Sequence, residues 1–146
     1  MTSPILVLKS ASEQRSLSRK KLASLITEGV AHRNGNRFQE ARDIFVNVSA
    51  ICPTEPYGEL GLGSTCFSEG RFDEAISHYC QALKLSPCNA YAYALLGESQ
   101  IFKFDYPAAR VSLRRACELD RKGPYGRLAQ QLLLLLDSLR LGAAQG

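Results

Sequence analysis

Apolar residues recur at helical spacing in three separate stretches of the chain, 38–48, 72–83 and 106–116. In the middle stretch they occupy positions 72, 75, 76, 79, 82 and 83, with polar residues between them. Steps of three and four place these residues along one face of an α-helix, whereas a half-buried strand would need strict alternation. The pattern therefore predicts an amphipathic helix in each stretch.

The three stretches repeat one another with a period of 34 residues. The same step relates these sets: Gly29, Gly63 and Gly97; Ala41, Ala75 and Ala109; Phe45, Tyr79 and Leu113; Pro53 and Pro87. Arg121 stands where a third proline would fall. A 34-residue period with these residue types is typical of the tetratricopeptide repeat. Each such repeat is a helix–turn–helix hairpin that buries its apolar face by stacking on its neighbours.

The period predicts an all-α fold in which three tandem tetratricopeptide helix–turn–helix repeats stack as a right-handed superhelix. The repeats are assigned to residues 22–55, 56–89 and 90–123. An N-terminal segment, 1–21, precedes them. We expect it to be disordered to about residue 12, and helical from about Ser16 as an extension of the first repeat.

Residues 124–146 follow the repeats and predict a C-terminal capping helix, from Tyr125 to about Leu141, and a short tail. This helix is apolar around most of its circumference, so we expect it to be buried on more than one side. Besides capping the stack, its leucines are candidates for self-association or contact with another protein. The residues assigned to this cap or self-association surface are Leu132, Leu135, Leu136 and Leu139.

Small residues and turn residues predict how each hairpin closes. Gly63 and Gly97 should face Tyr79 and Leu113, because a larger residue would overpack two closely spaced helices. Gly70 suits the left-handed position after a helix. The remaining predicted boundaries are Pro53 and Pro87 after helices, Thr54, Asn89 and Asp105 as N-terminal caps, and Pro107 in a first helical turn.

Composition fits a water-soluble globular chain. Of the 146 residues, 45% are hydrophobic and 22% are charged, and the net charge of +4 is too small to make nucleic acid the expected partner. The longest apolar run, Leu132 to Leu136, is far too short to span a bilayer. We expect no membrane insertion, no targeting segment and a cytoplasmic location. We interpret the basic residues near the N-terminus as a solvated helix face; they are Lys9, Arg15, Arg19, Lys20 and Lys21.

The sequence predicts no catalytic site, no cofactor and no metal site. No nucleotide-binding, metalloprotease or hydrolase motif is present, and His32 and His78 lie 46 residues apart. Gly61 and Gly63 lie inside a predicted helix, so they indicate close packing rather than a phosphate loop. Five cysteines without metal-ligand spacing are assigned reduced, structural roles: Cys52, Cys66, Cys80, Cys88 and Cys117.

The first helix of each hairpin should line a concave groove. Taking the recurring glycine as position eight, the positions facing the groove are two, five, nine and twelve. The assigned groove residues are Ile26, Val30, Tyr57, Leu60, Ser64, Phe67, Tyr91, Ala94, Glu98 and Ile101, with Ala23 and Arg33 completing the first repeat. This mostly apolar wall suits an extended or helical segment with spaced hydrophobic anchors.

Some tetratricopeptide proteins grip the C-terminal carboxylate of a chaperone with Lys, Asn and Arg side chains. Such a clamp needs charged or amide donors at fixed places. Here the matching places hold Ile26, Val30, Ser64 and Tyr91. The sequence therefore disfavours a carboxylate clamp.

Residues 60–66 and 70–79 resemble the second repeat of one branch, the small tetratricopeptide chaperones of bacterial type III secretion that hold translocator proteins. Leu60-Gly61-Leu62-Gly63-Ser64-Thr65-Cys66 is similar to that family's L-G-L-G-A-C-like run, and Gly70 to Tyr79 is similar to G-x-[YF]-[DE]-x-A-I-x-x-Y. The segment 35–45 is similar too, and the resemblance extends over about residues 18–125.

The resemblance implies a bacterial cytoplasmic chaperone that binds a hydrophobic segment of a secreted translocator and keeps it soluble before export. It implies contacts with that segment from Tyr57, Leu60, Ser64, Phe67, Tyr91, Ala94 and Ile101. The Leu-rich final helix separately predicts a dimer, formed with a second copy or with another protein. Alternatives are a general tetratricopeptide interaction scaffold, or a chaperone for a needle or export-apparatus subunit.

Overall fold

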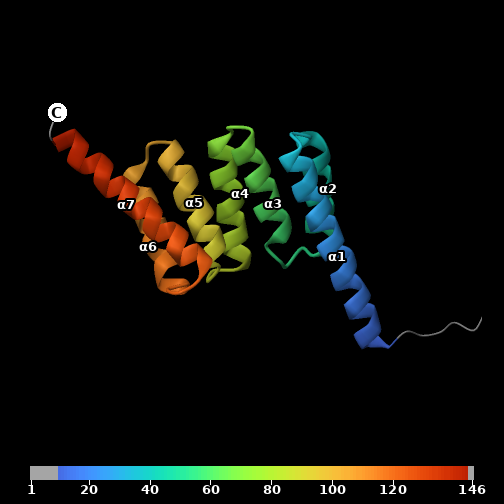
Figure 1. The fold of residues 1–146 in the computed structure, drawn as a ribbon. Coiled ribbons are helices and arrows are strands. Elements are labelled where there is room, and N and C mark those ends of the chain that lie inside the picture. The colour runs from blue at the N-terminus through green and yellow to red at the C-terminus, as the bar shows by residue number, and fades with distance from the viewer. Residues whose placement is uncertain (1–9, 145–146) are drawn as a thin grey trace, which may run out of the picture.

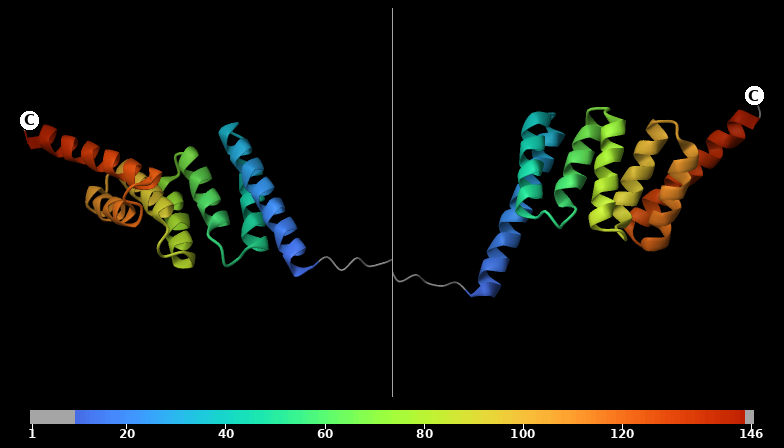
Figure 2. Two further views of the ribbon diagram at one scale, coloured as in Figure 1. Left: turned by 60° about the horizontal axis from the view of Figure 1, so that its bottom comes forward. Right: turned by 180° about the vertical axis from the view of Figure 1, so that it is seen from behind.

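The computed structural model describes residues 10–144, which form a stack of helical hairpins (Figures 1 and 2). Residues 1–9, which belong to the segment expected to be disordered, lie outside this range. The helices are α1 Ala11–Asn34, α2 Phe38–Ile51, α3 Tyr57–Ser68, α4 Phe72–Leu85, α5 Ala90–Phe102, α6 Tyr106–Leu119 and α7 Pro124–Ala144. The described residues contain no strand, and the predicted all-α tetratricopeptide fold is confirmed.

Each hairpin closes through a glycine on its first helix and a large side chain on its second. A Cβ added at Gly29 would lie 2.7 Å from the Phe45 ring, and one at Gly63 would lie 2.6 Å from the Tyr79 ring. Gly97 meets Leu113 in the same way. Since these large side chains are almost fully buried, the missing Cβ is what lets the two helix backbones approach.

The turn inside each hairpin places one residue in the left-handed region of backbone space. These residues are Asn36 (φ 59°), Gly70 (φ 76°) and Phe104 (φ 60°), spaced 34 residues apart. Glycine and asparagine adopt this conformation readily, whereas a bulky side chain is strained there. The prediction for Gly70 is confirmed, and the same turn is imposed on Phe104 against its own preference.

Two of the three predicted caps are present. Asn89 accepts a hydrogen bond from the Ala92 N–H at 3.0 Å, and Asp105 accepts one from the Ala108 N–H at 3.3 Å. The prediction for Thr54 is wrong, because α3 begins later, with Pro56 at its N-cap and no side-chain cap.

Helix α1 begins at Ala11, earlier than the expected start near Ser16. A capping box explains the difference: the Ser10 side chain accepts from the Glu13 N–H, and the Glu13 carboxylate accepts from the Ser10 N–H. As a result, α1 extends well beyond α2, as Figure 1 shows.

Helix α7 packs against α5 and α6 and closes the C-terminal end of the core. Leu136 and Ala129 on α7 join Ala94, Ala109 and Leu113 in one buried cluster. An ion pair between Arg110 Nη1 and Asp137 Oδ1, at 2.6 Å, ties α6 to α7. The helix is therefore a cap, as predicted, with Leu136 on its buried side. The expected burial on more than one side is wrong, because the other face exposes Leu134, Leu135, Leu139 and Leu141.

The exposure of two cysteines differs from the predictions. Cys66 is buried, but Cys80 and Cys88 are exposed, so a structural packing role is wrong for those two.

His78 links the two helices of the second hairpin. Its Nδ1 atom lies 2.7 Å from Glu59 Oε2 on α3.

Among the described helices, none is both long and apolar enough to cross a membrane.

Replacing Gly63 with alanine should destabilise the fold by about 1–3 kcal/mol, because the new methyl group overlaps the Tyr79 ring. Denaturant unfolding followed by circular dichroism measures the change. Gly142→Ala is the matched control, since an added Cβ there has no neighbour within 4 Å. An equal effect of the two substitutions would contradict the role given to the close approach.

Candidate functional site

A hollow of about 380 Å³ opens on the side of the stack formed by the first helices of the hairpins. A second hollow of about 500 Å³ continues it toward the start of α1, since Ile26 and Tyr57 line both. We call the two together the helix-A groove. The residues of its first part are Ile26, Val30, Arg33, Phe45, Tyr57, Leu60, Gly61, Ser64, Asn89, Tyr91 and Tyr125. The second part adds Arg19, Leu22, Ala23 and Glu55.

Six of the predicted groove residues line the first hollow: Ile26, Val30, Tyr57, Leu60, Ser64 and Tyr91. Their accessibility differs. The Tyr57 side chain is 43% exposed, whereas Leu60 is 8% exposed and belongs to the buried cluster around Tyr79. Leu60 therefore forms the floor of the groove, and Tyr57 belongs to its rim.

The other four predicted residues do not line this hollow. Phe67 packs at the far end of α3, with its ring centroid 5.2 Å from that of Phe102. Ala94 is fully buried and Ile101 is packed in the same cluster, because α7 covers this part of α5. Glu98 is half-buried on the same helix. The cap thus removes part of the third repeat from the predicted groove.

Tyr125, at the start of α7, is a groove residue that the sequence analysis missed. Its ring centroid lies 4.8 Å from that of Tyr91. Tyr57, Tyr91 and Tyr125 are spaced 34 residues apart and line the same hollow. Extending the period one step past residue 123 would have found it, because α7 occupies the place of a fourth first helix.

The resemblance of α7 to a first helix stops at the glycine position. The 34-residue step from Gly97 leads to Gln131, which is exposed. A glutamine side chain at this position would keep another helix from approaching as closely as Leu113 approaches Gly97. Helix α7 therefore has the groove-facing position of a repeat without its hairpin-closing position.

A glycine also shapes the groove floor. A Cβ at Gly61 would clash with the Phe45 ring, which reaches across from the preceding hairpin. The predicted packing role of Gly61 is thus confirmed, and it acts between repeats rather than within one.

A buried polar contact adjoins the mostly apolar first hollow at Ser64. The Tyr79 hydroxyl donates to Ser64 Oγ at 3.3 Å, and burial raises the pKa of Tyr79, so the phenol stays neutral. The charges of Arg33 and Glu98 both act on this phenol, in opposite directions. Burial also raises the pKa of Glu98, and desolvation is the one cause of that shift.

The lining of the first hollow contains few charged side chains. The described residues hold no group of three or more His, Cys, Asp or Glu side chains that could bind a metal ion. Of the side chains that line the first hollow, Arg33 alone carries a charge. Ile26, Val30 and Ser64, which occupy positions of a carboxylate clamp, all line the first hollow. The lining of the first hollow is therefore mostly apolar.

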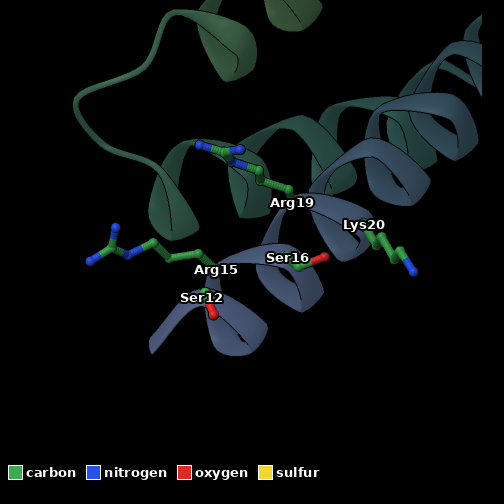
Figure 3. Close-up of a pocket in the computed structure, with 5 residues that line it drawn as sticks. All are labelled: Ser12, Arg15, Ser16, Arg19 and Lys20. Atoms are coloured by element: carbon green, nitrogen blue, oxygen red, sulfur yellow. The ribbon is translucent and has the colours of Figure 1, made fainter. Parts of the chain in front are cut away.

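A separate shallow hollow lies on the projecting start of α1 (Figure 3) and is lined by Ser12, Arg15, Ser16, Arg19 and Lys20. In the figure, the Arg15 and Lys20 side chains point to opposite sides of the helix. All five residues are exposed. Since the charges spread around the helix instead of converging, this part remains a solvated face, as the sequence suggested.

Comparison with known proteins agrees with this architecture. A family model described as TPR repeat matches residues 63–100. Subunit 3 of the anaphase-promoting complex from Schizosaccharomyces pombe is 25% identical over 109 residues, which are 75% of this chain and 16% of that protein. The chain thus spans about one sixth of the curated relative it matches.

Two solved structures illustrate the fold. The first tetratricopeptide domain of Spaghetti (RPAP3), bound to the HSP90 peptide SRMEEVD, has a TM-score of 0.72 and 20% identity, covering 84% of this chain and 94% of that one. The Yersinia enterocolitica type III secretion chaperone SycD, in complex with a peptide of the translocator YopD, has a TM-score of 0.73 and 19% identity, covering 85% and 95%. At these identities the likeness establishes the tetratricopeptide-repeat fold alone.

Replacing Glu98 with glutamine should raise the melting temperature at pH 7. Burial raises the Glu98 pKa above its ordinary value of 4.5, so the folded state binds this proton more tightly than the unfolded state does. The charged form therefore costs stability at neutral pH, and the cost disappears below the unfolded pKa. Thermal unfolding at pH 7 and at about pH 3.5 should show a gain that shrinks on acidification.

The exposed Glu40 provides the control for this experiment. Glu40→Gln removes the same charge without relieving a buried carboxylate, so its effect should be small and should not follow the same pH dependence. A Glu98→Gln variant that is less stable than the wild type at pH 7 would contradict the account.

Proposed function

We propose that this chain is a bacterial cytoplasmic chaperone that binds a hydrophobic segment of a type III secretion translocator in the helix-A groove and keeps it soluble before export. The observation that carries the proposal is the row of Tyr57, Tyr91 and Tyr125 beside Ile26 and Val30. These side chains come from α1, α3, α5 and α7, and they present Tyr57 and the packed Tyr91–Tyr125 pair as separate apolar contacts. A segment with spaced hydrophobic anchors is complementary to such a row.

The physics of the groove suits a client that must remain unfolded. A protein destined to enter a membrane exposes apolar segments that aggregate in water. Covering one such segment protects it while leaving the rest of the client free to pass through a secretion channel. A few anchors, each contributing about 2 kcal/mol, would supply the affinity.

The choice of client rests on two further supports. The residues 60–66 and 70–79 resemble the translocator chaperones, and SycD holds a peptide of the translocator YopD on the same fold. The RPAP3 domain instead binds the HSP90 peptide SRMEEVD, which ends in an aspartate. The apolar residues Ile26 and Val30 and the aromatic Tyr91 at the clamp positions disfavour that chemistry here.

A general interaction scaffold is the second candidate. The anaphase-promoting complex subunit supports it, because that relative is part of a large assembly by name and this chain matches only a portion of it. In this alternative the same groove would hold a segment of an assembly partner. A needle or export-apparatus subunit is a third candidate client, and it would bind in the groove through an amphipathic helix of its own.

Replacing Tyr57 or Tyr91 with alanine should weaken client binding tenfold or more, because each change removes an aromatic anchor. Fluorescence anisotropy with labelled 15-residue peptides, tiled across translocator sequences, measures the affinity. The peptide SRMEEVD, which the RPAP3 domain binds, should show no comparable affinity for the wild-type chain.

The exposed residue Val46 on α2 gives a matched control outside the groove. Val46→Ala should leave peptide binding unchanged. Leu60 is unsuitable for the test, since its burial would turn a polar replacement into a folding defect. Binding of SRMEEVD but of no translocator peptide would overturn the proposal, and so would translocator binding that survives both tyrosine substitutions.

A further inference from the structure

Phe104 is held in a conformation that its side chain disfavours, and it is 78% exposed. The equivalent positions in the other hairpins carry Asn36 and Gly70, which tolerate the left-handed backbone. Among the described residues, Phe104 pairs with one aromatic ring, that of Tyr106, with the ring centroids 6.4 Å apart. The fold therefore gains little from an aromatic ring here, although it bears the cost of strain and of apolar exposure. Such an outlier is a reason to look for a function on the surface.

An apolar hollow lies immediately beside Phe104. It lies between the start of α6 and the end of α7, has a volume of about 480 Å³, and is lined by Tyr106, Pro107, Arg110, Leu136, Leu139 and Arg140. Leu139 is 45% exposed at its edge. An apolar cavity of about 150 Å³ is enough to hold a benzene ring, so this hollow has room for a phenyl side chain.

The projecting ring and the hollow share one surface, because Tyr106 contacts Phe104 and also lines the hollow. We propose that this surface joins two copies of the chain about a two-fold axis, with Phe104 of each copy inserted into the hollow formed by Tyr106, Pro107 and Leu139 of the other. A two-fold interface requires a surface complementary to itself. A knob placed next to a matching hole fulfils this requirement.

The charges around this surface are also complementary to one another across the proposed two-fold axis. Asp105 adjoins the projecting ring in sequence, and Arg140 lies on the rim of the hollow. Inserting Phe104 therefore brings the Asp105 carboxylate of one copy toward the Arg140 guanidinium of the other. Arg110 is already paired with Asp137 within each copy, so it adds no unpaired charge.

This interface would leave the helix-A groove free. Tyr91 lies in the first turn of α5, and Phe104 follows the end of that helix. Thirteen residues at about 1.5 Å each separate them by roughly 20 Å along the helix axis. Dimerisation and client binding should therefore respond to different substitutions.

Sedimentation equilibrium of the full chain tests the proposal. The wild type should be dimeric at tens of micromolar, and Phe104→Gly should raise the dimer dissociation constant at least tenfold. The same substitution should raise the melting temperature of the monomer, because glycine relieves the left-handed strain. Loss of association together with a more stable fold cannot be ascribed to misfolding.

Asn36→Gly is the matched control, since it places glycine at the equivalent turn of the first hairpin. It should leave the dimer dissociation constant unchanged. Leu139→Ala, on the hollow side, should weaken the dimer without altering peptide binding in the groove. A wild type that stays monomeric at tens of micromolar would overturn the proposal. This holds even if the monomer uses Phe104 to bind a different protein. A dimer that tolerates both Phe104→Gly and Leu139→Ala would overturn it as well.

Discussion

The whole stack depends on one contact, in which a glycine on the first helix of a hairpin receives a large side chain from the second. Gly29 with Phe45, Gly63 with Tyr79 and Gly97 with Leu113 are three copies of it. Because the ring or branched chain fills the space of a missing Cβ, the two helices lie close and keep a fixed relative rotation. That rotation brings every first helix to the same wall, and the groove follows from this repetition.

The groove combines two kinds of surface that serve different ends. Its floor, including Leu60 and the ring of Phe45, is also part of the core, so it is rigid and nearly closed to solvent. Its rim carries the exposed Tyr57 and the packed pair of Tyr91 and Tyr125. Ser64, which accepts a hydrogen bond from the Tyr79 hydroxyl, is a polar point in this mostly apolar wall. Binding and folding thus draw on neighbouring faces of the same helices.

The fold could be predicted from sequence because a 34-residue period fixes helix pairing through a few small residues. The groove could be predicted in part, since position within a first helix determines which way a side chain points. Ala94 and Ile101 were misplaced because covering by α7 depends on tertiary packing that no local pattern records. Tyr125 was within reach of the period but lay beyond the assumed last repeat. The strain at Phe104 emerges only when three turns are compared in space.

The tyrosine row offers fewer separate contacts than it has members. The ring centroids of Tyr91 and Tyr125 lie only 4.8 Å apart, so these two side chains form one aromatic patch. Tyr57, which is 43% exposed, stands as the other contact on the rim. A polypeptide laid across the groove would accordingly be held at two points, which makes the trough a two-point reader of short motifs.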